Sequence, residues 1–99
     1  MPSPRLICLE PTNAPRLAST PRRLAPRPSS FDDSVMGLVS NTLGRSQELL
    51  AAIHRELTRG AAGTQAIEVV KPHKSVPPSP VQWAELRARA TLALTGFGG

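Results

Sequence analysis

Apolar residues recur at helical spacing through the middle of the chain. No proline occurs between Ser30 and Arg59, and one stripe of apolar positions runs through this stretch: Val35, Val39, Leu43, Leu50, Ile53 and Leu57. When Ser46 is included as a polar member, the steps are all three or four residues long. That spacing is typical of a helix that packs along one face. The pattern therefore predicts a helical interaction segment over residues 31–59.

The ends of this segment carry helix signals. Ser30 and Asp33 have the spacing of a capping box at the start, and Gly60 can take the left-handed conformation that ends a helix. Gly37 and Gly44 each lower helix stability by about 1 kcal/mol relative to alanine. We therefore expect either one helix or two, the latter at 31–43 and 46–59.

A second helix is predicted over residues 80–95. Ser79 can cap it, with Pro80 at the first helical position and Gln82 at the third. Trp83 and Leu86 then begin a run of apolar residues at helical spacing. Residues 60–79 are predicted to be a flexible basic linker. Within it, residues 66–71 resemble a strand without a mate, which is expected to be extended or to pair across a dimer.

The first 30 residues differ sharply from the rest in composition. They hold seven of the eleven prolines and one acid, Glu10, against five arginines: Arg5, Arg16, Arg22, Arg23 and Arg27. Proline removes backbone donors and opposes helix, and few apolar groups offset the entropy of ordering. We predict a disordered basic tail over 1–30. The fold class expected is mostly α, with two short amphipathic helices following this tail.

Candidate chemistry is sparse. Cys8, His54 and His73 are the only soft or imidazole ligands, too few for the usual four-ligand zinc site. Cys8 lies in the tail without a rigid base beside it. We therefore expect no catalytic residues, no metal and no cofactor, and hence a protein that is not an enzyme. No apolar run is long enough for a membrane span, and the protein is expected to be intracellular.

These patterns predict a small regulatory or adaptor protein that acts by association. The apolar stripe, with Trp83 and Leu86, is expected to pack against a second copy or a partner protein. The arginines of the tail would contact nucleic acid or another acidic surface, an interaction that weakens steeply with salt.

Two alternatives remain open at this point. The chain could be a largely disordered signalling adaptor or kinase substrate, since Ser3-Pro4, Thr20-Pro21 and Ser79-Pro80 resemble proline-directed sites. Residues 74–80 also fit polyproline docking. Alternatively, it could be an organelle protein whose arginine-rich and serine-rich first 30 residues are removed on import.

Three stretches resemble the MucR/Ros family of bacterial transcriptional regulators. Residues 39–41 with 48–54 are similar to the family's N-terminal helical region, and residues 70–76 to the basic link before its zinc finger. Residues 80–98 are similar to its C-terminal tail. The resemblance implies an oligomerisation helix and a link to transcription. The chain departs from the family because there is neither room nor any cysteine for the zinc finger, so no metal or base-contact residues are carried over.

Overall fold

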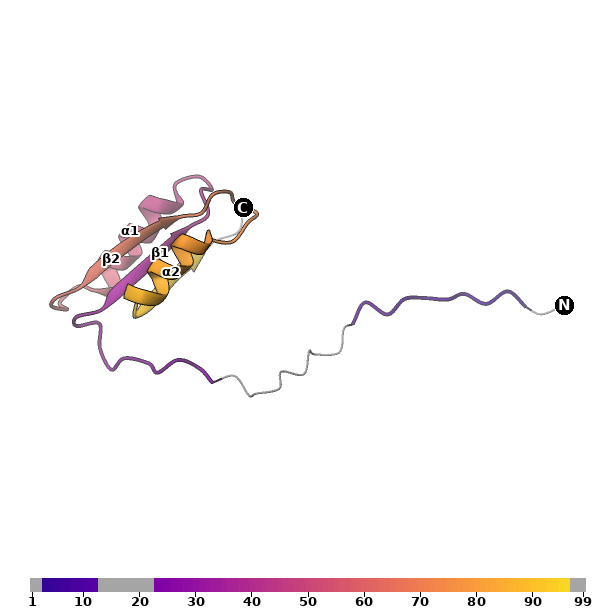
Figure 1. Cartoon of the computed structure of the whole chain (residues 1–99), viewed down its shortest axis with the longest axis horizontal. Coiled ribbons are helices and arrows are strands. Elements are labelled where there is room, and N and C mark those ends of the chain that lie inside the picture. Colours follow the sequence, from indigo (N-terminus) through magenta and orange to yellow (C-terminus); the bar gives the residue numbers. More distant parts are fainter. Residues whose placement is uncertain (1–2, 13–22, 97–99) are drawn as a thin grey trace.

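The computed structural model describes residues 3–12 and 23–96, and within them the chain forms an α/β fold. The elements follow the order β1 (Val35–Ser40), α1 (Ser46–Leu57), β2 (Gln65–Val70), α2 (Pro80–Arg89) and β3 (Leu92–Gly96). Residues 3–12 and 23–30 are exposed and contain neither helix nor strand. Residues 3–12 lie well away from the folded unit in Figure 1.

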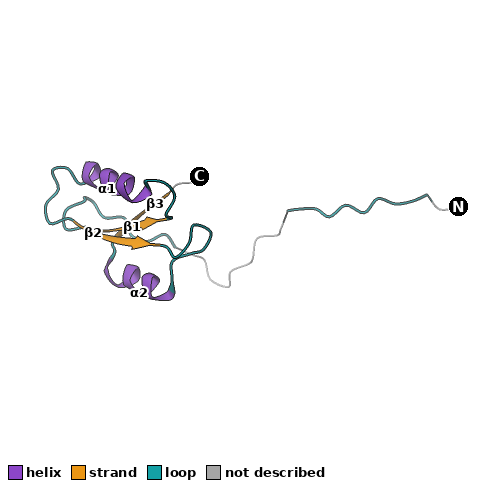
Figure 2. Ribbon diagram, turned by 90° about the horizontal axis from the view of Figure 1, so that it is seen from above, coloured by secondary structure: helices purple, strands orange, loops and turns teal. Residues whose placement is uncertain are grey.

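The three strands form one parallel sheet in the order β2-β1-β3. The first crossover runs from β1 to β2, and the second returns past β1 to β3 on the other side. Parallel crossovers are right-handed almost without exception, so a reversal of direction places the two helices on opposite faces. Figure 2 shows this arrangement, with α1 on one face of the sheet and α2 on the other.

The central strand β1 is buried on both faces, and its alternate side chains divide the core into two clusters. Met36 and Leu38 pack with Leu50 of α1, and Leu92 and Leu94 of β3 complete this side. On the other face, Val39 packs in a second cluster with Ile67, Val69 and Leu86. Each fully buried leucine contributes about 2 kcal/mol, so both helices are held mainly by this burial.

Gly37 allows α2 to lie close to the sheet. A Cβ placed on Gly37 would stand 2.5 Å from Cδ2 of Leu86 and 3.6 Å from the Cβ of Ala90. The start of α2 is tied down separately, because Gln82 accepts a hydrogen bond from the Ser79 backbone and donates one to the Val70 carbonyl. The helix is thus fixed to β2 at its start and rests on β1 at its middle.

The expectation of a mostly α fold is wrong. The stretch predicted as helix over 31–43 contains strand β1, so the helical interaction segment 31–59 is helical only in its second half. A strand buried on both faces is apolar at nearly every position, and such a short run cannot be distinguished from a buried helix by periodicity alone. Val35 and Val39 are four residues apart in β1 and lie on one face of the sheet.

The C-terminal half needs a similar correction. Residues 60–79 are not only a flexible linker, because they contain β2, which pairs with β1 of the same chain from Val35↔Gln65 to Ser40↔Val70. Pairing of this strand across a dimer is therefore not needed. The helix predicted over 80–95 ends at Arg89, and residues 92–96 form β3 instead.

Several local predictions are confirmed. The helix expected at 46–59 is α1, and Gly60 has a positive φ of 82° just beyond it. The capping box of Ser79 and Gln82 is present, with Pro80 opening α2. By contrast, the Ser30–Asp33 pair caps no helix. Asp33 has a φ of 56°, and its backbone N–H donates to the carbonyl of Ala62, which joins the start of β1 to the turn before β2.

We predict that Gly37→Ala destabilises the protein by about 1–3 kcal/mol, because the added methyl group meets Leu86 in a packed core. In a Leu86→Ala background the same substitution should cost almost nothing, since the clashing atoms are gone. A double-mutant cycle measured by urea unfolding checks this coupling. An equal loss of unfolding free energy in both backgrounds would show that contact with Leu86 is not what requires a glycine at position 37.

Candidate functional site

An apolar groove of about 350 Å³ opens beside strand β3 on the face covered by α2. Its lining comes from three elements and the loop before α2: Val39, Pro78, Trp83, Leu86, Ala93 and Thr95 are among the lining residues. We call this hollow the α2–β3 groove. It exists because α2 packs over β1 and β2, where Leu86 meets Val39, Ile67 and Val69, and leaves the outer part of this face uncovered.

Strand β3 is an edge strand in the described part of the chain. It pairs with β1 along one side, from Met36↔Leu92 to Ser40↔Gly96, and no described strand lies on the other side. An exposed edge presents unpaired N–H and C=O groups that can pair with another strand. The α2–β3 groove therefore lies next to a row of backbone groups that is available for hydrogen bonding.

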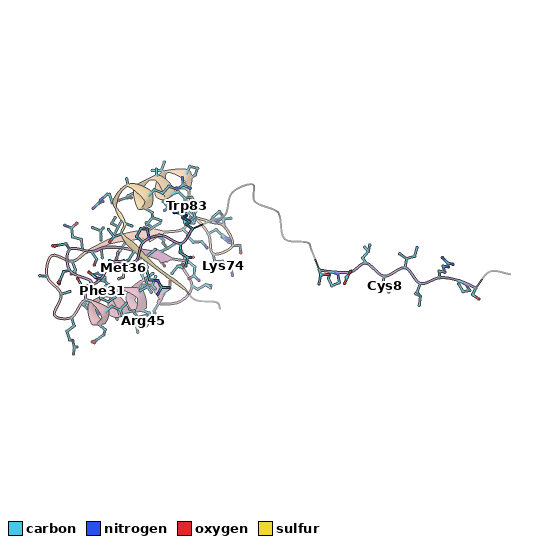
Figure 3. The ribbon with its side chains drawn as sticks, turned by 90° about the horizontal axis from the view of Figure 1, so that it is seen from below. Cys8, Phe31, Met36, Arg45, Lys74 and Trp83 are labelled. Atoms are coloured by element: carbon cyan, nitrogen blue, oxygen red, sulfur yellow. The ribbon has the colours of Figure 1, made fainter. Side chains whose placement is uncertain are left out.

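Trp83 is the largest apolar side chain of the groove and remains 41 % exposed. The Arg87 guanidinium lies one turn further along α2, with its carbon 5.9 Å from the centre of the indole ring. An arginine over an aromatic face is held by the ring's quadrupole. Figure 3 shows Trp83 on the α2 side of the sheet, opposite Met36 and Phe31. The groove thus combines an aromatic surface with one cation at its rim.

The predicted interaction stripe does not form one surface. Leu50 is 2 % exposed in the core under α1, while Val39 and Leu86 lie across the sheet from it. Leu57 is 43 % exposed at the end of α1, and Val35, Leu43 and Ile53 are half-buried. Val39, Trp83 and Leu86 of the predicted set come together in the α2–β3 groove, and Val35 packs against the buried cluster that contains Val39 and Leu86.

The groove also uses residues that the sequence analysis missed, namely Pro78, Ala93 and Thr95. The alternation of Leu92, Ala93, Leu94 and Thr95 was the available signal, because in a strand it places the leucines on one face and the small residues on the other. Among the tail arginines, Arg5, Arg23 and Arg27 are exposed, while Arg16 and Arg22 lie outside the described residues.

Some residues of the short linear motifs lie within the folded unit. Pro78 is buried against the groove, Ser79 caps α2 and Pro80 is the first residue of that helix. Ser3-Pro4 lies in the exposed tail, and Thr20-Pro21 is outside the described residues. The second half of residues 74–80 is therefore part of the structured connection from β2 into α2.

A second location of interest is the carboxyl edge of the sheet, where β1 ends beside β3. The two crossovers leave this edge after β1 and after β2 and run over opposite faces of the sheet, and no element follows β3 in the described residues. The β1–α1 loop at this edge is well ordered by its own side chains. Ser40 Oγ and Ser46 Oγ are 2.8 Å apart, and the Thr42 and Leu43 backbone N–H groups donate to Ser40 Oγ and Asn41 Oδ1.

Thr42 in this loop has a φ of 68°. A β-branched residue rarely adopts that conformation, which costs about 1–2 kcal/mol and tends to occur at functional positions. Arg45 follows the loop but is engaged by Glu48. This edge is therefore a polar turn with a strained residue, whereas the α2–β3 groove is a larger apolar surface with an open strand beside it.

The described residues contain no group of three histidine, cysteine or acidic side chains that could hold a metal ion. None of their helices is long and apolar enough to cross a membrane. Cys8 is an exposed free thiol in the tail segment, far from the folded unit in Figure 3.

We predict that Thr42→Asn raises the free energy of unfolding by about 1 kcal/mol, because asparagine tolerates a positive φ far better than threonine. Thr95→Asn serves as the matched control, since Thr95 is an exposed strand residue, and it should give no such gain. Chemical denaturation of both variants checks the prediction. A Thr42→Asn variant less stable than the parent would contradict it.

The comparisons with known proteins give one family. The model of the UGSC family matches residues 7–99, which is all of the chain except its first six residues. Neither the curated proteins nor the solved structures gave a match. The match carries no information on the resemblance to MucR/Ros regulators, which stays a prediction. The matched region includes the tail segment from Ile7 onward as well as all five elements of the sheet, and the chain belongs to the UGSC family.

Proposed function

We propose that this chain functions by protein association and that the α2–β3 groove is its docking surface. The observation that carries the proposal is the combination of an apolar groove of about 350 Å³ with the unpaired edge of β3. Large apolar hollows on a small domain are typical of interaction sites. A partner that enters here removes from water both the groove lining and the backbone groups at the edge.

The mode of docking follows from the two parts of the surface. A partner segment in extended conformation pairs with β3 by backbone hydrogen bonds, and its alternate side chains enter the groove over Ala93 and Thr95. This is recognition by strand addition, in which the backbone supplies affinity and the pocket supplies selectivity. Trp83 is the anchor of the surface, because a half-exposed tryptophan gains most when a partner covers it.

The basic tail adds a second contact in this proposal. Arg5, Arg23 and Arg27 are exposed in the described part of the tail and are joined to the folded unit through a proline-rich segment. In this proposal they contact phosphates or another acidic surface while the groove holds a protein. Contact with nucleic acid through these arginines remains part of the proposal and would decline steeply as salt is raised.

We expect Ala93→Arg to weaken docking roughly a hundredfold, because it leaves an unpaired charge in an apolar interface at a cost of about 3 kcal/mol. Ala66→Arg is the matched control, since Ala66 is also an exposed alanine on a strand but lies on β2, at the opposite edge and on the other face. The measurement is affinity capture from source cells with the parent and both variants, compared protein by protein.

The proposal requires that a defined set of proteins be retained by the parent and by Ala66→Arg but lost from Ala93→Arg. Circular dichroism of the variants establishes that both keep the parent's fold. If the same set is retained on all three baits, the groove is not a docking surface.

A further inference from the structure

The tail contains an apolar segment that the fold leaves unused. Leu6, Ile7 and Leu9 are 95 %, 88 % and 93 % exposed, and Cys8 between them is exposed as well. We call residues 6–9 the apolar tail segment. Consecutive exposed apolar residues are costly in water, and the family match begins within this segment, at Ile7. Ile7, Cys8 and Leu9 therefore lie within the residues that the family model matches, and Leu6 lies directly before them.

The free edge of β3 has room on both faces. The α2–β3 groove lies on one face, and on the other a hollow of about 360 Å³ is lined by residues 27–31 together with Leu92. Phe31 and Leu92 supply the apolar part of this second hollow and pack against the core under α1. A strand added beside β3 would therefore meet a hollow on each of its faces.

The two hollows determine which pattern of residues suits a strand added beside β3. An edge strand with one face in solvent alternates apolar and polar residues, whereas a strand covered on both faces is apolar at consecutive positions. The apolar tail segment has four such positions in a row. With a period of two, Ile7 and Leu9 enter one hollow while Leu6 and Cys8 enter the other. Within 3–12 and 23–30, these are the only consecutive apolar residues of this length.

The connection to the folded unit favours exchange between two chains. Residues 11–29 contain five prolines, and proline-rich linkers are semi-rigid spacers that extend about 3.1 Å per residue. Figure 1 shows residues 3–12 projecting away from their own sheet, where they can reach a neighbouring molecule.

We propose that the apolar tail segment of a second copy of this chain adds as a strand to the free edge of β3. The inference rests on the proposed function and names the partner for the α2–β3 groove. Reciprocal exchange gives a closed dimer in which the tail segment of each copy adds a strand to the sheet of the other. The β3 edges of both copies are then paired. Heterologous proteins with a similar apolar segment would compete for the same edge.

The test is size-exclusion chromatography with light scattering on the full chain at several concentrations. We expect a species of twice the 10.5 kDa chain mass that becomes a monomer in the Ile7→Asp/Leu9→Asp variant. Because both residues are exposed in the tail, this variant keeps the folded unit. Leu24→Asp is the matched control, since Leu24 is also an exposed tail leucine, and it should remain a dimer.

A second measurement uses a labelled peptide of residues 3–12 added to the full-length Ile7→Asp/Leu9→Asp variant, whose groove is vacated. We expect saturable binding that is lost when Ala93→Arg is combined with these substitutions. A dimer that survives Ile7→Asp/Leu9→Asp but not Ala93→Arg would overturn the inference and leave the proposed function standing. A parent chain that is monomeric at all concentrations, with no peptide binding, would overturn the inference as well.

Discussion

The structure depends on burying one strand on both faces. β1 contains Met36 and Leu38 on one side and Val39 on the other, and neither set can be covered without a helix. The chain supplies α1 to the first face and α2 to the second, and the parallel crossovers that carry these helices require β2 and β3 on either side of β1. Gly37 completes this arrangement, because its lack of a side chain leaves space for Leu86 on the α2 face.

The sequence allowed the helical parts of this arrangement to be predicted, because they have local signals. Gln82 and Ser79 form a capping box, and Gly60 follows α1. The strands lacked such signals, because the apolar run at Val35–Ser40 also fits helical spacing and its true partners lie about 30 and 55 residues further along the chain. The candidate site was only partly predictable, since Val39 and Trp83 become neighbours only through the crossover that places α2 over β1.

The edge at β3 connects the fold to the proposed function. A two-faced core built around β1 is complete at its centre but leaves β3 half covered, with Leu92 and Leu94 half-buried on one face and Ala93 and Thr95 exposed on the other. The small domain therefore gains from anything that extends its sheet, both through apolar burial and through pairing of the edge. Within the described residues of the tail, the apolar tail segment has the composition that suits a strand in that position.

Amide hydrogen exchange along β3, followed by NMR, tests this account most directly. The Gln65 N–H donates to the Ser34 carbonyl and the Lys71 N–H to the Ser40 carbonyl, so the backbone groups of Gly37 and Val39 face β3, opposite Ala93 and Thr95. In a parallel pair such residues bond to the neighbours of their partner, so the N–H group of Leu94 faces β1, while those of Ala93 and Thr95 face the free edge. The account predicts that Ala93 and Thr95 exchange fast in dilute protein and become protected as concentration rises, with Leu94 protected throughout. Ala93 and Thr95 amides that exchange equally fast at every concentration would contradict it.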